Sequence, residues 1–255
     1  AAPIGVAVGT GVAPPDPRAV PAPDVSSIVR GITVSDNTIV ADNAGGAAVQ
    51  VDGASISTGA VGVDSTNMAR NQITAAGDGI AIGASAANGE DSVLTRIDTL
   101  STNTIKANQR GVVIDRTAAE DGAETIDTLK LDGNMIDAKG VGISLQSAAA
   151  AGAVNTTSAH LTRTATLTNN TINTTAGLGI AVLATDAGDG GIITDRLVIS
   201  GNTITVVNGA AADDTAVRVG GSATGAGSAQ TITFSDNTVG SADNGIAIGN
   251  GGALV

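Results

Sequence analysis

The sequence of 255 residues contains no cysteine, tryptophan or tyrosine, and Phe234 is its only phenylalanine. The absence of cysteine excludes a disulfide-stabilised scaffold and the metal or redox chemistry that depends on thiolates. The shortage of aromatic residues excludes a core built on large ring side chains, which dominate ordinary protein interiors. Any core must therefore consist of Ala and branched aliphatic residues, and the abundance of Ile and Val favours β-strands.

Basic residues are also scarce. The chain has 12 Lys and Arg residues against 24 Asp and Glu residues, a net charge of -12 and a pI near 4.2. Because the basic residues are few and scattered, we expect no binding to nucleic acid or to anionic membranes. No stretch approaches 18 consecutive apolar residues, and no basic segment followed by an apolar one opens the chain. We therefore expect neither membrane insertion nor a retained signal peptide.

A short motif recurs seven times along the chain. Each copy has an apolar residue three positions before an Asn and a β-branched residue two positions after it, and these asparagines are Asn37, Asn71, Asn103, Asn134, Asn170, Asn202 and Asn237. A second motif, a small residue followed by apolar, any and apolar residues, recurs from Gly5-Val6-Ala7-Val8 to Gly245-Ile246-Ala247-Ile248 with a mean spacing of about 34 residues. Such repeats indicate a solenoid whose units bury their apolar faces against one another.

Each repeat is predicted to hold three short strands: one before the Asn, one after it and one at the Gly-led motif. Alternating burial supports strands, and no helical stripe of apolar residues is present. The Asn is predicted to occupy a tight bend, where it tolerates left-handed backbone geometry, and to stack with its equivalents as an inward amide ladder. The variable connections 84–93, 116–124, 147–159 and 185–193 are predicted to be loops.

These motifs resemble those of right-handed parallel β-helix proteins, typified by pectate lyases and by β-helical surface passengers such as those of autotransporters. The resemblance covers residues 4–250. Together with the repeat it predicts an all-β, right-handed parallel β-helix of about seven coils of roughly 34 residues. We expect a single domain over residues 1–255, with a Pro-rich loop at 13–24.

Both ends of the sequence stop within the solenoid pattern, and no amphipathic capping helix is visible. Solenoids need caps to cover their exposed strand edges and apolar core. Val6 and Val8 at one end, and Ile246 and Ile248 at the other, are therefore candidate assembly residues. We expect either that the solenoid is part of a longer protein or that copies stack end to end.

The resemblance implies that catalytic residues would lie on the outer face of the Gly-led sheet. The outward column of that sheet holds no acidic residue and one basic residue, Arg218. Polysaccharide hydrolysis generally requires paired carboxylates, and lyases require an equivalent set of groups. Asp213, Asp214 and Arg218 are the weak candidates, but charge on a solvated loop is the interpretation we favour.

Calcium is the one cofactor with any support in the sequence. Asp186 with Asp189, and Glu120 with Asp121, are oxygen-rich pairs followed by glycine, as in some calcium loops. Neither pair repeats at the nine-residue period of calcium-binding β-rolls. We therefore favour surface solvation and expect no bound cofactor.

The combined features favour a structural or adhesive module of a bacterial extracellular or cell-surface protein, which could also be a head-to-tail filament subunit. Coils that contact only their neighbours can extend a rod by repetition, and an acidic surface limits nonspecific association. The expected partners are further β-helix coils, copies of the chain, or a glycan or protein at a cell surface. The alternatives are a polysaccharide lyase or glycoside hydrolase of the β-helix class and a calcium-dependent adhesive module.

Overall fold

The computed structural model describes the backbone of residues 6–8 and all of residues 27–146, 148–151, 158–183, 185–188, 190–207, 215–220, 227–240 and 244–249. The predicted Pro-rich loop 13–24 lies outside these residues. All described regular elements are β-strands, and every pairing between them is parallel. No helix in the described part of the chain is long and apolar enough to cross a membrane.

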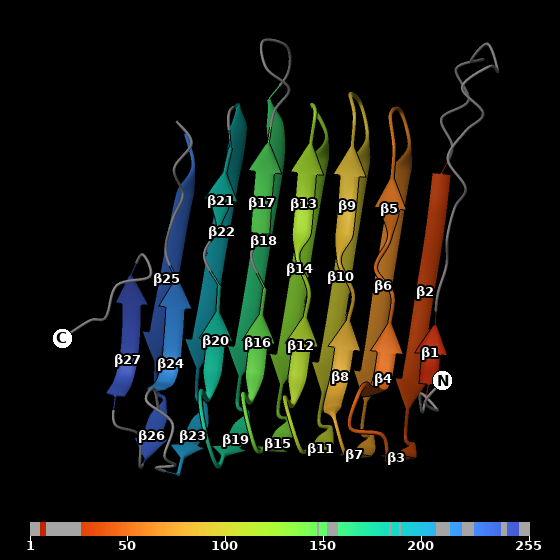
Figure 1. The fold of residues 1–255 in the computed structure, drawn as a ribbon. Coiled ribbons are helices and arrows are strands. Elements are labelled where there is room, and N and C mark those ends of the chain that lie inside the picture. The colour runs from red at the N-terminus through yellow and green to blue at the C-terminus, as the bar shows by residue number, and fades with distance from the viewer. Residues whose placement is uncertain are drawn as a thin grey trace.

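Three parallel sheets run the length of the molecule (Figure 1). Sheet A contains the Gly-led motifs and has eight strands: β1 (Val6–Val8), β4 (Ala47–Val51), β8 (Asp78–Ile82), β12 (Val112–Ile114), β16 (Ile143–Leu145), β20 (Ile180–Val182), β24 (Thr215–Gly220) and β27 (Asn244–Gly249). Sheet B precedes the asparagines and has seven: β2 (Ser27–Ser35), β6 (Val61–Ala69), β10 (Val93–Ser101), β14 (Glu124–Asp132), β18 (Ala159–Thr168), β22 (Gly191–Ser200) and β25 (Ala229–Ser235). Sheet C follows the asparagines and also has seven: β3 (Thr38–Ala41), β7 (Gln72–Ala75), β11 (Thr104–Ala107), β15 (Met135–Ala138), β19 (Thr171–Thr174), β23 (Thr203–Val206) and β26 (Thr238–Gly240).

The chain winds through sheets B, C and A in each coil and then returns to sheet B one strand further along. Following β6, β7, β8 and β10 in Figure 1 shows that the winding is right-handed. Seven such sets of three strands follow one another, and the repeated asparagines separate sheet B from sheet C in each set. The predicted right-handed parallel β-helix of about seven coils is therefore confirmed.

A fourth sheet, which we did not predict, lies in segments expected to be loops. Sheet D consists of β5 (Ser55–Ile56), β9 (Ser85–Asn88), β13 (Thr117–Glu120), β17 (Ala148–Ala151) and β21 (Asp186–Ala187). Three of these strands lie within the predicted loops 84–93, 116–124 and 147–159, and β21 lies within 185–193, so the loop prediction was wrong there. The strands before the asparagines are longer than expected, mostly nine or ten residues. One part of each strand contributes to the long core with sheet A, and the other part packs toward sheet D.

The interior is divided into one long core and two smaller apolar clusters. The long core contains the repeated Ile and Leu residues on both sides of the asparagines, together with the apolar members of the Gly-led motifs. The smaller clusters lie between sheet D and the first half of the sheet B strands; Leu94 and Leu161 are their central residues. Sheet D thus encloses additional apolar surface that a three-sheet coil would expose.

Candidate functional site

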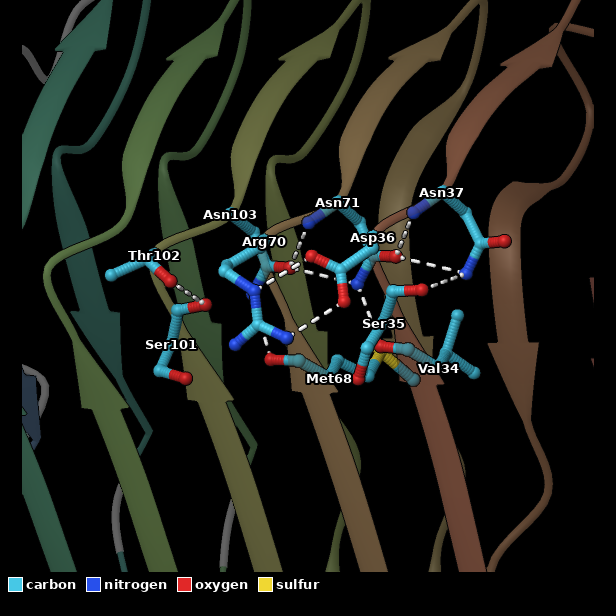
Figure 2. Close-up of polar contacts among 10 residues, drawn as sticks. All are labelled: Val34, Ser35, Asp36, Asn37, Met68, Arg70, Asn71, Ser101, Thr102 and Asn103. Carbon is cyan, nitrogen blue, oxygen red and sulfur yellow. Dashed lines mark hydrogen bonds and ion pairs between the residues drawn. The ribbon is translucent and has the colours of Figure 1, made fainter.

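The predicted asparagine ladder is present along the inside of the bends (Figure 2). In the middle of the ladder, Asn134 Oδ1 accepts hydrogen bonds from the backbone N and the Nδ2 of Asn103, both at 3.0 Å. Asn134 Nδ2 donates to Asn170 Oδ1 and, toward the preceding coil, to the backbone O of Leu100, both at 2.9 Å. The same pattern joins all seven asparagines. Every interior amide is thereby fully hydrogen-bonded although it is buried.

The left-handed residue of each bend is the one before the Asn, not the Asn itself. Seven residues occupy this position with φ between 53° and 65°: Asp36, Arg70, Thr102, Gly133, Asn169, Gly201 and Asp236. Our assignment of left-handed geometry to the Asn was therefore wrong by one residue. The Asn side chain must point inward to form the ladder, so the preceding residue makes the turn and points toward solvent.

At the first two bends the outward residues form an ion pair on the surface (Figure 2). Arg70 Nε and Nη2 donate to the two carboxylate oxygens of Asp36, each at 2.7 Å. These hydrogen bonds lower the pKa of Asp36 and raise that of Arg70. Both side chains are about 60% exposed, so water screens the pair and its contribution to stability is small.

Sheet B carries a second ladder, of buried charged residues, which we did not predict from the sequence. In register across successive strands it contains Arg30, Asp64, Arg96, Asp127, Arg163, Asp195 and Gln230. This charge column lies between the long core and the smaller apolar clusters, where sheet A passes into sheet D. The sequence does contain a pattern that indicates this column, because each member stands seven residues before a ladder Asn and Arg alternates with Asp.

The two ends of the charge column are closely paired. Arg163 Nε and Nη2 donate to the two oxygens of Asp195 at 2.8 and 2.7 Å, and Arg163 Nη1 donates to the backbone O of Gln146. Gln230 Nε2 donates to the same Asp195 carboxylate at 3.0 Å. At the other end Arg30 Nε donates to Asp64 at 2.7 Å, and the pair is nine-tenths buried. Bidentate geometry of this kind compensates for the loss of hydration.

The centre of the charge column has an excess of carboxylates around Arg96, which is fully buried. Arg96 Nε donates to Asp98 at 2.6 Å, and Arg96 Nη1 donates to Thr117 Oγ1, whose hydroxyl donates in turn to Asp127. Burial opposes the charge of Arg96, but the carboxylates of Asp98 and Asp127 outweigh burial and raise the Arg96 pKa. Burial raises the pKa of Asp98 despite its contact with Arg96. Since these groups are enclosed, they cannot contact a substrate.

A surface groove of about 500 Å³ runs along the outer edge of sheet C. Small residues at the ends of the strands line it, including Ala41, Ala75, Ala107 and Ala138. Its polar lining residues include Asp42 from the first coil, Lys106 from the third, Asp137 and Lys139 from the fourth, and Asn173 from the fifth. Asn173 Nδ2 donates to Asp137 at 2.8 Å. Within the described residues, Lys106 and Lys139 form no ion pair.

The weak catalytic and calcium candidates are only partly described. Asp213, Asp214 and Asp189 lie outside the described residues. Arg218 is exposed on β24, Asp186 is exposed on β21, and Asp121 follows β13 with a φ of 54°.

Glu120, the other member of the second oxygen-rich pair, ends β13. Its Oε1 accepts a hydrogen bond from Arg116 Nη2 at 3.4 Å. No group of three or more His, Cys, Asp or Glu residues in the described chain could hold a metal ion.

The candidate assembly residues lie on the two outermost strands of sheet A (Figure 1). Ile246 and Ile248 on β27 pair in register with Val217 and Val219, yet they are 45% and 39% exposed, whereas the two valines are buried. The isoleucines thus belong to the core columns and lie half exposed at the edge of the described sheet. At the opposite end, β1 pairs with β4, although the Val6 and Val8 side chains lie outside the described part of the structure.

The fold and its two interior ladders define the chain as a parallel β-solenoid. In comparisons with known proteins, no family model, no curated protein and no solved structure matches it.

Proposed function

We propose that the chain is a structural and adhesive β-solenoid module of a bacterial extracellular or cell-surface protein. The observation that carries this proposal is the groove along sheet C, because it extends across successive coils of a rod with a continuous, hydrogen-bonded interior. The resemblance of the Asn and Gly-led motifs to β-helical surface passengers supports the same assignment.

The groove suits an extended chain molecule. Successive coils present equivalent positions about 4.8 Å apart, so a ligand with a short regular repeat can make similar contacts in each coil. Lys106, Asp137 and Asn173 occupy the same outward column and offer both donors and acceptors. A polysaccharide, whose hydroxyl groups both donate and accept hydrogen bonds, is the ligand class that fits this arrangement.

Retention of the purified chain on immobilised bacterial and host polysaccharides tests the proposal. The double variant Lys106→Ala, Lys139→Ala removes two groove cations, and Lys130→Ala is the matched control because Lys130 lies outside the groove beside Asp132. We expect saturable binding by the unmodified chain. The double variant should weaken this binding about tenfold, equivalent to about 1.4 kcal/mol, whereas the control variant should retain it. Absence of binding to every surface tested would contradict the adhesive role.

The same assay separates the alternatives. Release of new saccharide ends during incubation would instead indicate a lyase or hydrolase. Binding that disappears with a chelator and returns with calcium would indicate a calcium-dependent module.

A further inference from the structure

The charge column is electrically balanced without Asp98. Arg and Asp alternate along it, so its three guanidiniums meet three carboxylates, and Gln230 beyond them is neutral. Asp98 lies on β10 two residues after Arg96, in the neighbouring inward column. It is therefore a fourth buried carboxylate in a part of the interior that holds three cations. One negative charge is left without a counterpart.

The surroundings of Asp98 are mainly apolar. In register it lies between Thr66 on β6 and Leu129 on β14. The remaining members of its column are all aliphatic: Ile32, Ala165, Leu197 and Ile232. The Asp98 side chain is only 2% exposed. An ionised carboxylate enclosed in this way loses its hydration, which favours the neutral carboxylic acid.

Asp98 also shares its cation with other carboxylates. Among the described residues, Arg96 is the one cation that contacts Asp98, with its Nε 2.6 Å from the Asp98 carboxylate. Asp64 and Asp127 attract the same guanidinium. Each of those two lies in register between two guanidiniums of the charge column, whereas the register neighbours of Asp98 carry no charge. Of the three carboxylates around Arg96, Asp98 thus has the fewest neighbouring cations.

Burial decides the protonation of Asp98. Burial raises its pKa, the charge of Arg96 lowers it, and the negative charge of Asp127 on β14 raises it again. Because burial prevails, the carboxyl holds its proton to a higher pH than an exposed Asp does.

The remaining groups that face Asp98 or Arg96 add no positive charge within the described part of the chain. The Thr66 hydroxyl faces Asp98 from β6, is buried, and has no other hydrogen-bond partner. A hydroxyl both donates and accepts, so it can accept a hydrogen bond from a protonated Asp98. On the opposite wall, the Asp115 carbonyl and a threonine hydroxyl accept from Arg96. The side chains of Asp115 and Arg116 there are exposed.

We propose that the interior of the solenoid binds one proton at neutral pH, held by Asp98 as a neutral carboxylic acid that donates to Thr66 and accepts from Arg96. The proton takes the place of the missing fourth cation and leaves three guanidiniums with three carboxylates. Folding then takes up one proton from solution, because an exposed Asp in the unfolded chain is ionised at neutral pH. The groove along sheet C contains neither Asp98 nor its partners, so this inference is independent of polysaccharide binding.

The bound proton makes the solenoid more stable in mild acid than at alkaline pH. The pKa of Asp98 is higher in the folded chain than its ordinary value of 3.8, so its stabilising effect is complete below that value and is lost as the pH rises through the folded pKa. Across this range the folding equilibrium constant falls by up to about tenfold per pH unit. Asp36 and Asp132, whose pKa values are lowered, act in the opposite direction, but only below about pH 4.

The variant Asp98→Asn tests the proposal because asparagine imitates the neutral acid. Its amide donates to Thr66 and its carbonyl accepts from Arg96. Urea unfolding is followed by circular dichroism from pH 5 to 9. We expect the folding constant of the unmodified chain, divided by that of the variant, to fall about tenfold per pH unit from pH 5 to at least 7. The ratio cancels the exposed groups that both chains share, His160 among them.

Asp195→Asn is the matched control, because Asp195 has a guanidinium of its own, bound through two nitrogens of Arg163. This variant should lose stability by the same factor at every pH in the range. A constant ratio between the unmodified chain and Asp98→Asn from pH 5 to 9 would overturn the proposal. Loss of the pH dependence in Asp127→Asn, with its retention in Asp98→Asn, would overturn the assignment of the proton to Asp98.

Infrared spectroscopy of the unmodified chain gives a second readout that needs no variant to fold. Exposed Asp and Glu side chains are ionised at pH 7, so the carbonyl band of a protonated carboxylic acid at that pH reports a buried one. We expect this band in the folded chain and its loss on thermal unfolding at the same pH. A folded chain without the band at pH 7 would contradict the bound proton.

Discussion

Replacing Asn134 with alanine removes the centre of the asparagine ladder without changing the apolar core. The substitution leaves two buried donors unpaired, the backbone N of Asn103 and one hydrogen of Asn103 Nδ2, and it removes the amide donor from the carbonyl of Leu100. Asn170 Oδ1 retains a donor, because the backbone N of residue 134 still reaches it at 3.0 Å. Each buried unpaired donor costs about 1–3 kcal/mol, so the two donors give an expected loss of about 2–6 kcal/mol in the free energy of unfolding.

The matched control is Asn37→Ala, at the exposed start of the same ladder. Asn37 Nδ2 donates to Asn71 Oδ1 and to the Ser35 carbonyl, but water can replace both contacts. The expected loss is below about 1 kcal/mol. Urea unfolding followed by far-ultraviolet circular dichroism compares the two, since the chain has no Trp or Tyr to report by fluorescence. Equal midpoint shifts for both variants would refute the argument that buried hydrogen-bond satisfaction makes the ladder stabilising.

Three further substitutions test the bends, the charge column and the contact between coils. Thr102→Gly should raise stability by about 0.5–1 kcal/mol in thermal unfolding, because Thr102 has a φ of 53° where the equivalent bend has Gly133; a loss of stability would contradict this. Arg163→Met should cost about 3–5 kcal/mol by leaving the Asp195 carboxylate buried without its cation, and adding Asp195→Leu should recover most of that loss in urea unfolding. Gly111→Ala should cost about 1–3 kcal/mol, measured in the same way, because the new Cβ would lie 2.3 Å from an Ile side chain and 2.6 Å from a backbone carbonyl of the next coil.

The repeated asparagines and their apolar neighbours made the solenoid predictable. A position that carries the same residue type in every coil, such as Asn103, must have the same surroundings in every coil, and only stacking provides them. The same reasoning placed Ile246 and Ile248 in core columns at an edge, where the structure shows them half exposed. Periodicity therefore determined the sheets, the inward columns and the ladder.

Features that vary from coil to coil were not predictable in the same way. The charge column alternates between Arg residues such as Arg96 and Asp residues such as Asp127, so it does not repeat one residue type from coil to coil. In addition, isolated charged residues on strands are usually assigned to the surface. Sheet D was missed because its strands have two to four residues, mostly Ala and Ser, with little β-propensity. Those segments form strands because the strands above and below hold them, which is a tertiary effect.

The alternation in the charge column also restricts how the molecule can change its length. Deleting the coil that contains Arg96 would bring Asp64 against Asp127 in a dry interior, and deleting the coil that contains Asp127 would bring Arg96 against Arg163. Like charges in contact there cannot both remain ionised without a large cost. Removal or insertion of two coils preserves the alternation. The unit by which this rod can be shortened, lengthened or recombined is therefore the pair of coils, although the backbone repeats with every single coil.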